Sequence, residues 1–64
     1  MDEAFLRRVA AKIRRLAGKA CTLTSDIDDE YHYAIDKGLL VFEEWISGHF
    51  VITERGKNFL ADYY

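Results

Sequence analysis

Four basic residues recur near the start of the chain at spacings of four, three and four: Arg8, Lys12, Arg15 and Lys19. On an α-helix, these spacings place the side chains along one side. A row of cations on a helix is a surface that binds nucleic-acid phosphates. The same row also arises where basic stems cover the edge of a core and their charged ends pair with acidic residues, here Asp28, Asp29 and Glu30. The sequence leaves both interpretations open.

Residues that could support catalysis or metal binding are sparse. Glu43 and Glu44 are adjacent in an expected strand, so their carboxylates point to opposite faces and cannot share a proton or a substrate. His32 and His49 lie on different expected elements, without Cys or Asp at ligand spacing beyond ordinary surface acids. Cys21 is the only cysteine, which excludes an internal disulfide, and we expect it to be a small buried hydrophobe. The sequence predicts a non-catalytic protein with no metal, cofactor or small-molecule substrate.

The basic row needs a helix to carry it, and one is expected over about residues 2–17. Asp2 and Glu3 stand at the positive end of its dipole, and Gly18 is a stop signal. The apolar positions fall within an arc of roughly 100°, the width of a core-facing stripe. They are Phe5, Leu6, Val9, Ile13, Leu16 and Ala20. We expect this stripe to be buried.

The next segment has two parts. Residues 21–27, CTLTSDI, contain β-branched residues and form either a short strand that pairs with a later hairpin or a loop. A second helix is expected from an N-cap at Ser25 to about Asp36. Its apolar residues repeat at helical spacing, at Ile27, Tyr31, Ala34 and Ile35. Gly38 suits the left-handed position that closes a helix.

A β-hairpin and a third helix follow directly. The apolar run 39–42 leads to Ser47-Gly48, and the run 49–52 returns, with a glycine able to adopt positive φ at the turn. A two-residue loop would place Trp45 opposite Phe50. Thr53 supplies the next N-cap, Glu54 a negative charge in the first turn, and Phe59, Leu60 and Tyr63 an apolar stripe. The prediction is a single α+β domain over residues 1–64, in the order helix, short strand or loop, helix, hairpin, helix.

The stretch from Lys37 to Leu60, which contains "GLL", the hairpin and "ITERGKNFL", resembles the wing and following helix of winged-helix transcription regulators. This resemblance implies a small DNA-binding regulator. A winged helix carries two helices between its first helix and the wing, whereas residues 18–37 have room for one, so the scaffold is a reduced one. Gly56 has a structural explanation as well, because a missing side chain lets the last helix approach the sheet closely.

Charge is divided unevenly along the chain. Residues 1–19 hold six basic and two acidic residues, net +4, and residues 20–64 hold three basic and nine acidic, net −6, which gives the −2 of the whole chain. The segment that matches a DNA-reading helix is DIDDEYHYAIDK, and the expected wing tip has no Arg or Lys. The acidic segment repels phosphates, and a wing tip without cations offers them no favourable contact. We therefore expect duplex binding to be weak and non-specific, on the order of 10⁻⁴ to 10⁻⁶ M at physiological salt.

Two functions follow from these patterns. The first is a winged-helix-like DNA-binding regulator that uses the basic row of the first helix and the wing rather than an acidic recognition helix. The second is a protein-interaction module or homodimer on the same scaffold, because a chain this short has a small core and its sheet has no plainly polar face. The residues expected at a partner interface are Trp45, Phe50, Tyr63 and Tyr64. No apolar run is long enough for a signal peptide or a membrane span, which favours a soluble cytoplasmic protein without a membrane partner.

Overall fold

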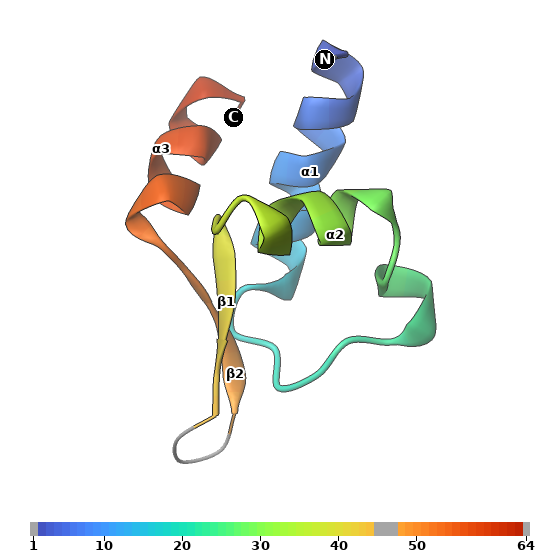
Figure 1. Ribbon diagram of the computed structural model, residues 1–64, viewed down its shortest axis with the longest axis vertical. Coiled ribbons are helices and arrows are strands. Elements are labelled where there is room, and N and C mark those ends of the chain that lie inside the picture. The colour runs from blue at the N-terminus through green and yellow to red at the C-terminus, as the bar shows by residue number, and fades with distance from the viewer. Residues whose placement is uncertain (1, 45–47, 64) are drawn as a thin grey trace.

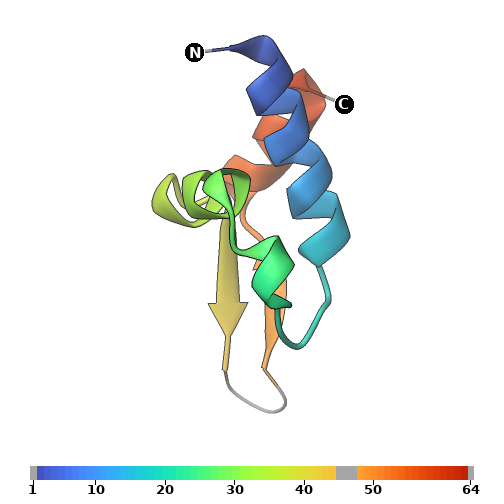
Figure 2. The ribbon, with the colours of Figure 1, turned by 90° about the vertical axis from the view of Figure 1, so that its right-hand side faces the viewer.

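The computed structural model of the protein describes residues 2–44 and 48–63. Within these residues, three α-helices and a two-stranded antiparallel sheet follow one another (Figure 1). Their order is α1 (Glu3–Leu16), a 3₁₀ turn η1 (Thr24–Asp26), α2 (Asp29–Asp36), β1 (Leu40–Glu43), β2 (His49–Ile52) and α3 (Glu54–Asp62). The predicted α+β class is confirmed. In Figure 1, α2 crosses in front of α1 and the hairpin extends away from the helices. Figure 2, turned by 90°, shows α3 packed behind α1. None of the described helices is long and apolar enough to cross a membrane.

Helix α1 spans Glu3–Leu16, close to its predicted limits. The side chain of Asp2 caps it by accepting a hydrogen bond of 3.1 Å from the Ala4 amide. Four residues of the predicted apolar stripe are buried on its inner face: Leu6, Val9, Ile13 and Leu16. Ala10, which the stripe did not include, is buried too, and Phe5 is half-buried. Ala20 is an exception, because the helix has already ended and this residue is exposed.

The strand considered for residues 21–27 does not form, and the chain makes the turn η1 at Thr24–Asp26 instead. The chain pairs with the hairpin before residue 21, at Gly18 and Lys19. Gly18 N–H donates to Phe50 O, and Phe50 N–H donates to Lys19 O, both at 2.9 Å. Cys21 is exposed, so its predicted burial is wrong. The two backbone bonds hold the chain against β2 just before Cys21, and the next residues leave the sheet toward η1.

Helix α2 spans Asp29–Asp36, so its predicted start near Ser25 is wrong. Asp28 is the N-cap, and its carboxylate accepts a hydrogen bond of 3.0 Å from the Tyr31 amide. Of the four apolar residues at helical spacing, only Ala34 is buried; Tyr31 is half-buried, and Ile27 and Ile35 are exposed. The late start explains the exposure of Ile27, which lies outside the helix.

The end of α2 follows the prediction. Gly38 has φ of +70°, its N–H donates to Ile35 O at 3.1 Å, and Leu39 N–H donates to Ala34 O at 2.9 Å. These two bonds form a Schellman motif, which satisfies carbonyls that the helix leaves unpaired at its end.

Strands β1, Leu40–Glu43, and β2, His49–Ile52, form the predicted hairpin with a different register. Phe50 lies opposite Phe42, so the predicted two-residue loop and its pairing of Phe50 with Trp45 are wrong. Trp45 itself is outside the described residues. Gly48 has φ of +69°, as predicted for the turn, and a Cβ there would come within 3.0 Å of the Phe42 ring.

Helix α3, Glu54–Asp62, begins at the predicted N-cap. The Thr53 hydroxyl accepts from the Gly56 amide at 3.0 Å and donates to Gly38 O at 2.6 Å, which ties α3 to the end of α2. Gly56 is buried, and a Cβ there would collide with Leu39 O and lie 2.8 Å from the Ile52 side chain. The predicted reason for this glycine, a close approach of α3 to the sheet, is confirmed.

The core lies where α1, α2 and the hairpin meet. Its buried residues are Val9, Ile13, Leu16, Ala34, Leu39, Leu40 and Phe50. The predicted stripe of α3 is half-buried, with Phe59 and Leu60 against this core and Tyr63 against Phe59 at 4.8 Å between ring centroids. A core of this size leaves several apolar side chains at the surface.

Candidate functional site

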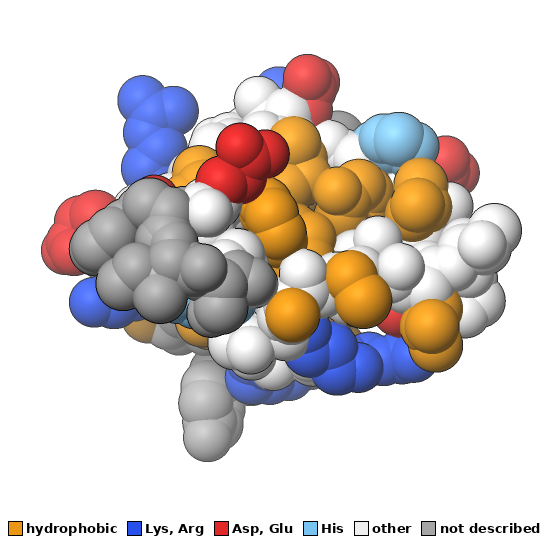
Figure 3. All heavy atoms as spheres, turned by 90° about the horizontal axis from the view of Figure 1, so that it is seen from below, with side chains coloured by type: hydrophobic (Ala, Val, Ile, Leu, Met, Phe, Trp, Pro, Cys, Tyr) orange, Lys and Arg blue, Asp and Glu red, His pale blue; other side chains and the backbone are white. Residues whose placement is uncertain are grey.

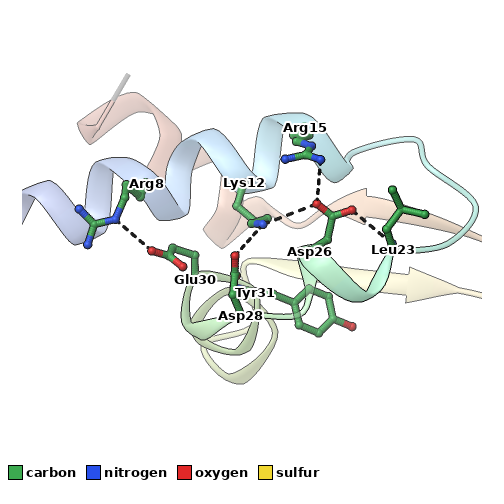
Figure 4. Close-up of polar contacts among 8 residues, drawn as sticks. All are labelled: Arg8, Lys12, Arg15, Leu23, Asp26, Asp28, Glu30 and Tyr31. Carbon is green, nitrogen blue, oxygen red and sulfur yellow. Dashed lines mark hydrogen bonds and ion pairs between the residues drawn. The ribbon is translucent and has the colours of Figure 1, made fainter.

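The basic row of α1 faces the acidic segment that runs from η1 into α2 (Figure 4). At one end of this contact, Arg8 Nε donates to Glu30 Oε1 at 3.0 Å. Arg8 is largely exposed and Glu30 is largely shielded. The pair therefore lies at the rim of the contact between the two helices, where water screens it and its contribution to stability is about 0 to 1 kcal/mol.

Lys12 occupies the centre of the contact. Its side chain is only 10% exposed, and its Nζ lies 2.9 Å from Asp28 Oδ2 and 3.7 Å from Asp26 Oδ1. The hydrogen bond from Lys12 lowers the pKa of Asp28 below its usual value, and the Tyr31 amide lowers it further. Asp28 thus has two roles, since the same carboxylate caps α2 and holds α1 against it.

Asp26 is the one buried charged residue in the described part of the chain, with 1% of its side chain exposed. Its Oδ1 lies 3.0 Å from Arg15 Nη2 and also near Lys12, but neither contact is a well-directed hydrogen bond. Its Oδ2 accepts from the Leu23 amide at 3.2 Å. Two cations therefore compensate the buried charge, and the backbone bond fixes the turn that carries it.

Three of the four predicted nucleic-acid contacts are therefore engaged within the protein. Arg8, Lys12 and Arg15 all have carboxylate partners. Lys19, beyond the end of α1, is exposed and has no ion pair in the part of the chain that the structure describes. Sequence reasoning anticipated pairing with the acidic segment but missed Asp26 as its centre. The only sequence feature that could have identified Asp26 is its position two residues before the Asp28 cap, within the segment predicted to be the start of α2.

The predicted partner-contact residues are in different places. Phe50 is 5% exposed and belongs to the core, whereas Phe42 beside it, with ring centroids 5.0 Å apart, is 42% exposed. Phe42 is thus the ring of this pair that a partner can reach. Tyr63 is half-buried against α3, and Trp45 and Tyr64 lie outside the described residues. Sequence reasoning had no means of choosing Phe42, because the choice depends on the strand register.

Hydrophobic side chains gather on the face seen along the hairpin, with Lys and Arg side chains at one edge (Figure 3). Exposed large hydrophobic residues on the described chain include Leu23, Ile27 and Phe42. Val41 is exposed as well, but on the opposite face of β1 from Phe42. Leu23 is the most exposed of them, at 63%. Exposed apolar surface beside charged side chains is typical of protein-contact sites. This face is a candidate interface.

Groups of three or more His, Cys, Asp or Glu side chains that could hold a metal ion do not occur within residues 2–44 and 48–63. Comparisons with protein-family models, curated proteins and solved structures find no match to this chain.

Proposed function

We propose that the protein is a non-catalytic interaction module that binds another protein, or a second copy of itself, on a reduced winged-helix-like scaffold. One observation carries the proposal: three of the four cations of the α1 row are held by carboxylates of η1 and α2, at distances of 2.9 to 3.0 Å. A phosphate would have to displace these carboxylates. The row therefore supports an internal contact better than a nucleic-acid surface.

Exposed apolar side chains also favour protein binding. Phe42 is half-exposed, yet its ring packs edge to face against the buried Phe50, so its position is fixed before any partner arrives. A rigid, partly exposed aromatic ring loses little conformational entropy on binding. Leu23 and Ile27, just before and just after the turn η1, add apolar area outside the hairpin.

A DNA-binding regulator is the second candidate. The hairpin followed directly by α3, with Thr53 as its cap, supports the winged-helix resemblance, and the exposed Lys19 supports a phosphate contact next to β2. Against it, the first turn of α2 carries Asp29 and Glu30. A helix with this end toward the DNA backbone would repel it.

One experiment separates the two candidates. The unmodified protein is titrated with a 20-base-pair duplex at about 50 and 150 mM salt, and its mass is followed by light scattering from micromolar to millimolar concentration. We expect weak, non-specific duplex binding and an association that Phe42→Ser reduces. Val41→Ser is the matched control, because Val41 lies on the other face of the strand. Tight binding to one duplex sequence at the higher salt would refute the proposal.

A further inference from the structure

An open groove of about 830 Å³ lies between the start of α1 and the outer side of α2. It is separate from the apolar face beside the hairpin and from the ion pairs around Lys12. Its floor is apolar, made by Phe5, Tyr33 and Ile35, and its rim holds three carboxylates, those of Asp2, Asp29 and Asp36. None of these carboxylates takes part in the ion pairs between α1 and α2.

The floor of the groove is preformed. The rings of Phe5 and Tyr33 meet edge to face, with centroids 5.6 Å apart and planes at 83°, and both pack against the core. Ile35 is 38% exposed on the outer side of α2. A ligand that binds here meets an ordered apolar surface and need not reorganise it.

The charge of the groove is negative. Arg8 also lines it, but its charge is balanced by the ion pair with Glu30. Lys37 stands nearby, with its Nζ 5.7 Å from the Tyr33 ring centroid. Three rim carboxylates against one remaining cation leave a net charge of −2 when His32, which also lines the groove, is neutral. The complementary ligand is cationic.

The rings of the floor already attract cations of the chain itself. The Arg8 guanidinium carbon lies 5.8 Å from the Phe5 ring centroid, and Lys37 lies at a similar distance from Tyr33. Both distances are within the range of cation–π attraction. The groove is also lined by Ile35 and by two exposed carboxylates, those of Asp29 and Asp36.

We propose that this groove binds a basic segment of a partner protein through an Arg or Lys side chain. The alkyl stem of that side chain would lie on Ile35 and the aromatic floor, and its charged end would pair with Asp29 or Asp36. The inference rests on the proposed function, since it names the chemistry of a protein partner. The groove is nevertheless a second binding surface, because it lies apart from the hairpin and its exposed Phe42.

The test is an NMR titration of the ¹⁵N-labelled full chain with the peptide acetyl-Ala-Arg-Leu-Arg-Ala-amide. We expect saturable shifts that are largest at the amides of His32, Tyr33 and Ile35. The variant Asp29→Asn/Asp36→Asn should weaken binding roughly three- to tenfold, because each exposed ion pair contributes modestly. Asp36→Asn alone should weaken it roughly two- to fivefold, and it leaves the first turn of α2 untouched.

The matched control is Glu54→Gln/Asp62→Asn, which changes the net charge by the same amount at two residues of α3 that do not line the groove. It should leave the peptide affinity within about twofold, since water and salt screen distant charges. Equal weakening in both double variants, shifts scattered over the surface, or no shifts at all would overturn the inference. Those outcomes leave the proposed function standing, whereas tight sequence-specific duplex binding removes the proposed function itself.

Discussion

Replacing Asp26 with Asn tests whether the contact between α1 and α2 depends on one buried charge. The carboxylate is 1% exposed, lies 3.0 Å from Arg15 and 3.7 Å from Lys12, and accepts a backbone bond from Leu23. Asn has nearly the same shape and can keep the bond to Leu23. The substitution therefore removes the charge and little else.

The expected loss of stability depends on which partners Lys12 and Arg15 retain after the substitution. Breaking a buried ion pair typically costs about 3 to 5 kcal/mol. Here Lys12 retains Asp28 at 2.9 Å, and Arg15, about half exposed, can turn into water. We therefore expect a loss of about 2 kcal/mol, which is a large share of the roughly 3 to 10 kcal/mol typical of a domain this size. The melting temperature should fall by about 8 to 16 °C.

The assay is urea and thermal unfolding followed by far-ultraviolet circular dichroism. Asp36→Asn is the control, since it removes one carboxylate from the exposed end of α2 and should change stability by about 0.5 kcal/mol or less. The difference between the two variants should persist in 1 M salt, because buried pairs are screened little. If Asp26→Asn unfolds at the same urea concentration as Asp36→Asn, the buried charge does not hold the two helices together.

Three further predictions concern the basic row, the hairpin turn at Gly48 and unfolding at acidic pH. The variant Arg8→Ala/Arg15→Ala should lose about 0 to 1 kcal/mol from the Arg8 pair in urea unfolding, and more than that from Arg15, because the buried Asp26 then keeps only Lys12 at 3.7 Å. The salt dependence of duplex binding should stay unchanged; a slope flattened by nearly two units would instead place both arginines on phosphates. Gly48→Val should destabilise by about 1 to 3 kcal/mol in the same assay, because φ is +69° and the new side chain meets Phe42; an unchanged melting temperature would contradict this account of the turn. The lowered pKa of Asp28 adds stability that is fully present above its ordinary value of 3.8 and is lost as pH falls through the folded value, so unfolding monitored from pH 6 down to 2 should show a loss below about pH 4 that Asp28→Asn reduces.

Local signals in the sequence predicted the ends of the helices well. Thr53 caps α3 and Gly38 closes α2 in the left-handed conformation, both as expected. Asp2, predicted only as a favourable charge at the start of α1, is the N-cap of that helix. Each of these features depends on a few neighbouring residues, so a single stretch of sequence contains the information. The start of α2 was predicted wrongly because Ser25 and Asp28 are both good caps. The ion pairs of Asp26, which are tertiary contacts, keep the preceding turn out of the helix.

The hairpin register was predicted wrongly for a related reason. The prediction counted residues outward from the tip, where Ser47-Gly48 suggested a short loop. The structure fixes the register from the base, where Thr53 N–H donates to Leu39 O at 3.2 Å and the Thr53 hydroxyl bonds Gly38. These contacts align Leu40 with Ile52. The position of Phe50 in the core and the exposure of Phe42 follow from that alignment, and no local pattern contains it.

The charge pattern shows how a division along the sequence can disappear in space. Residues 1–19 carry +4 and residues 20–64 carry −6, which along the chain looks like a basic arm on an acidic domain. Folding places α1 against η1 and α2, so most of the basic row meets carboxylates within 3 Å and projects little positive potential outward. Of that row, Lys19 alone has no ion pair on the described chain. One phosphate contact releases about one counterion, so a row that offered only Lys19 would give a salt dependence of about one unit, too shallow for a protein whose affinity for DNA comes from this surface.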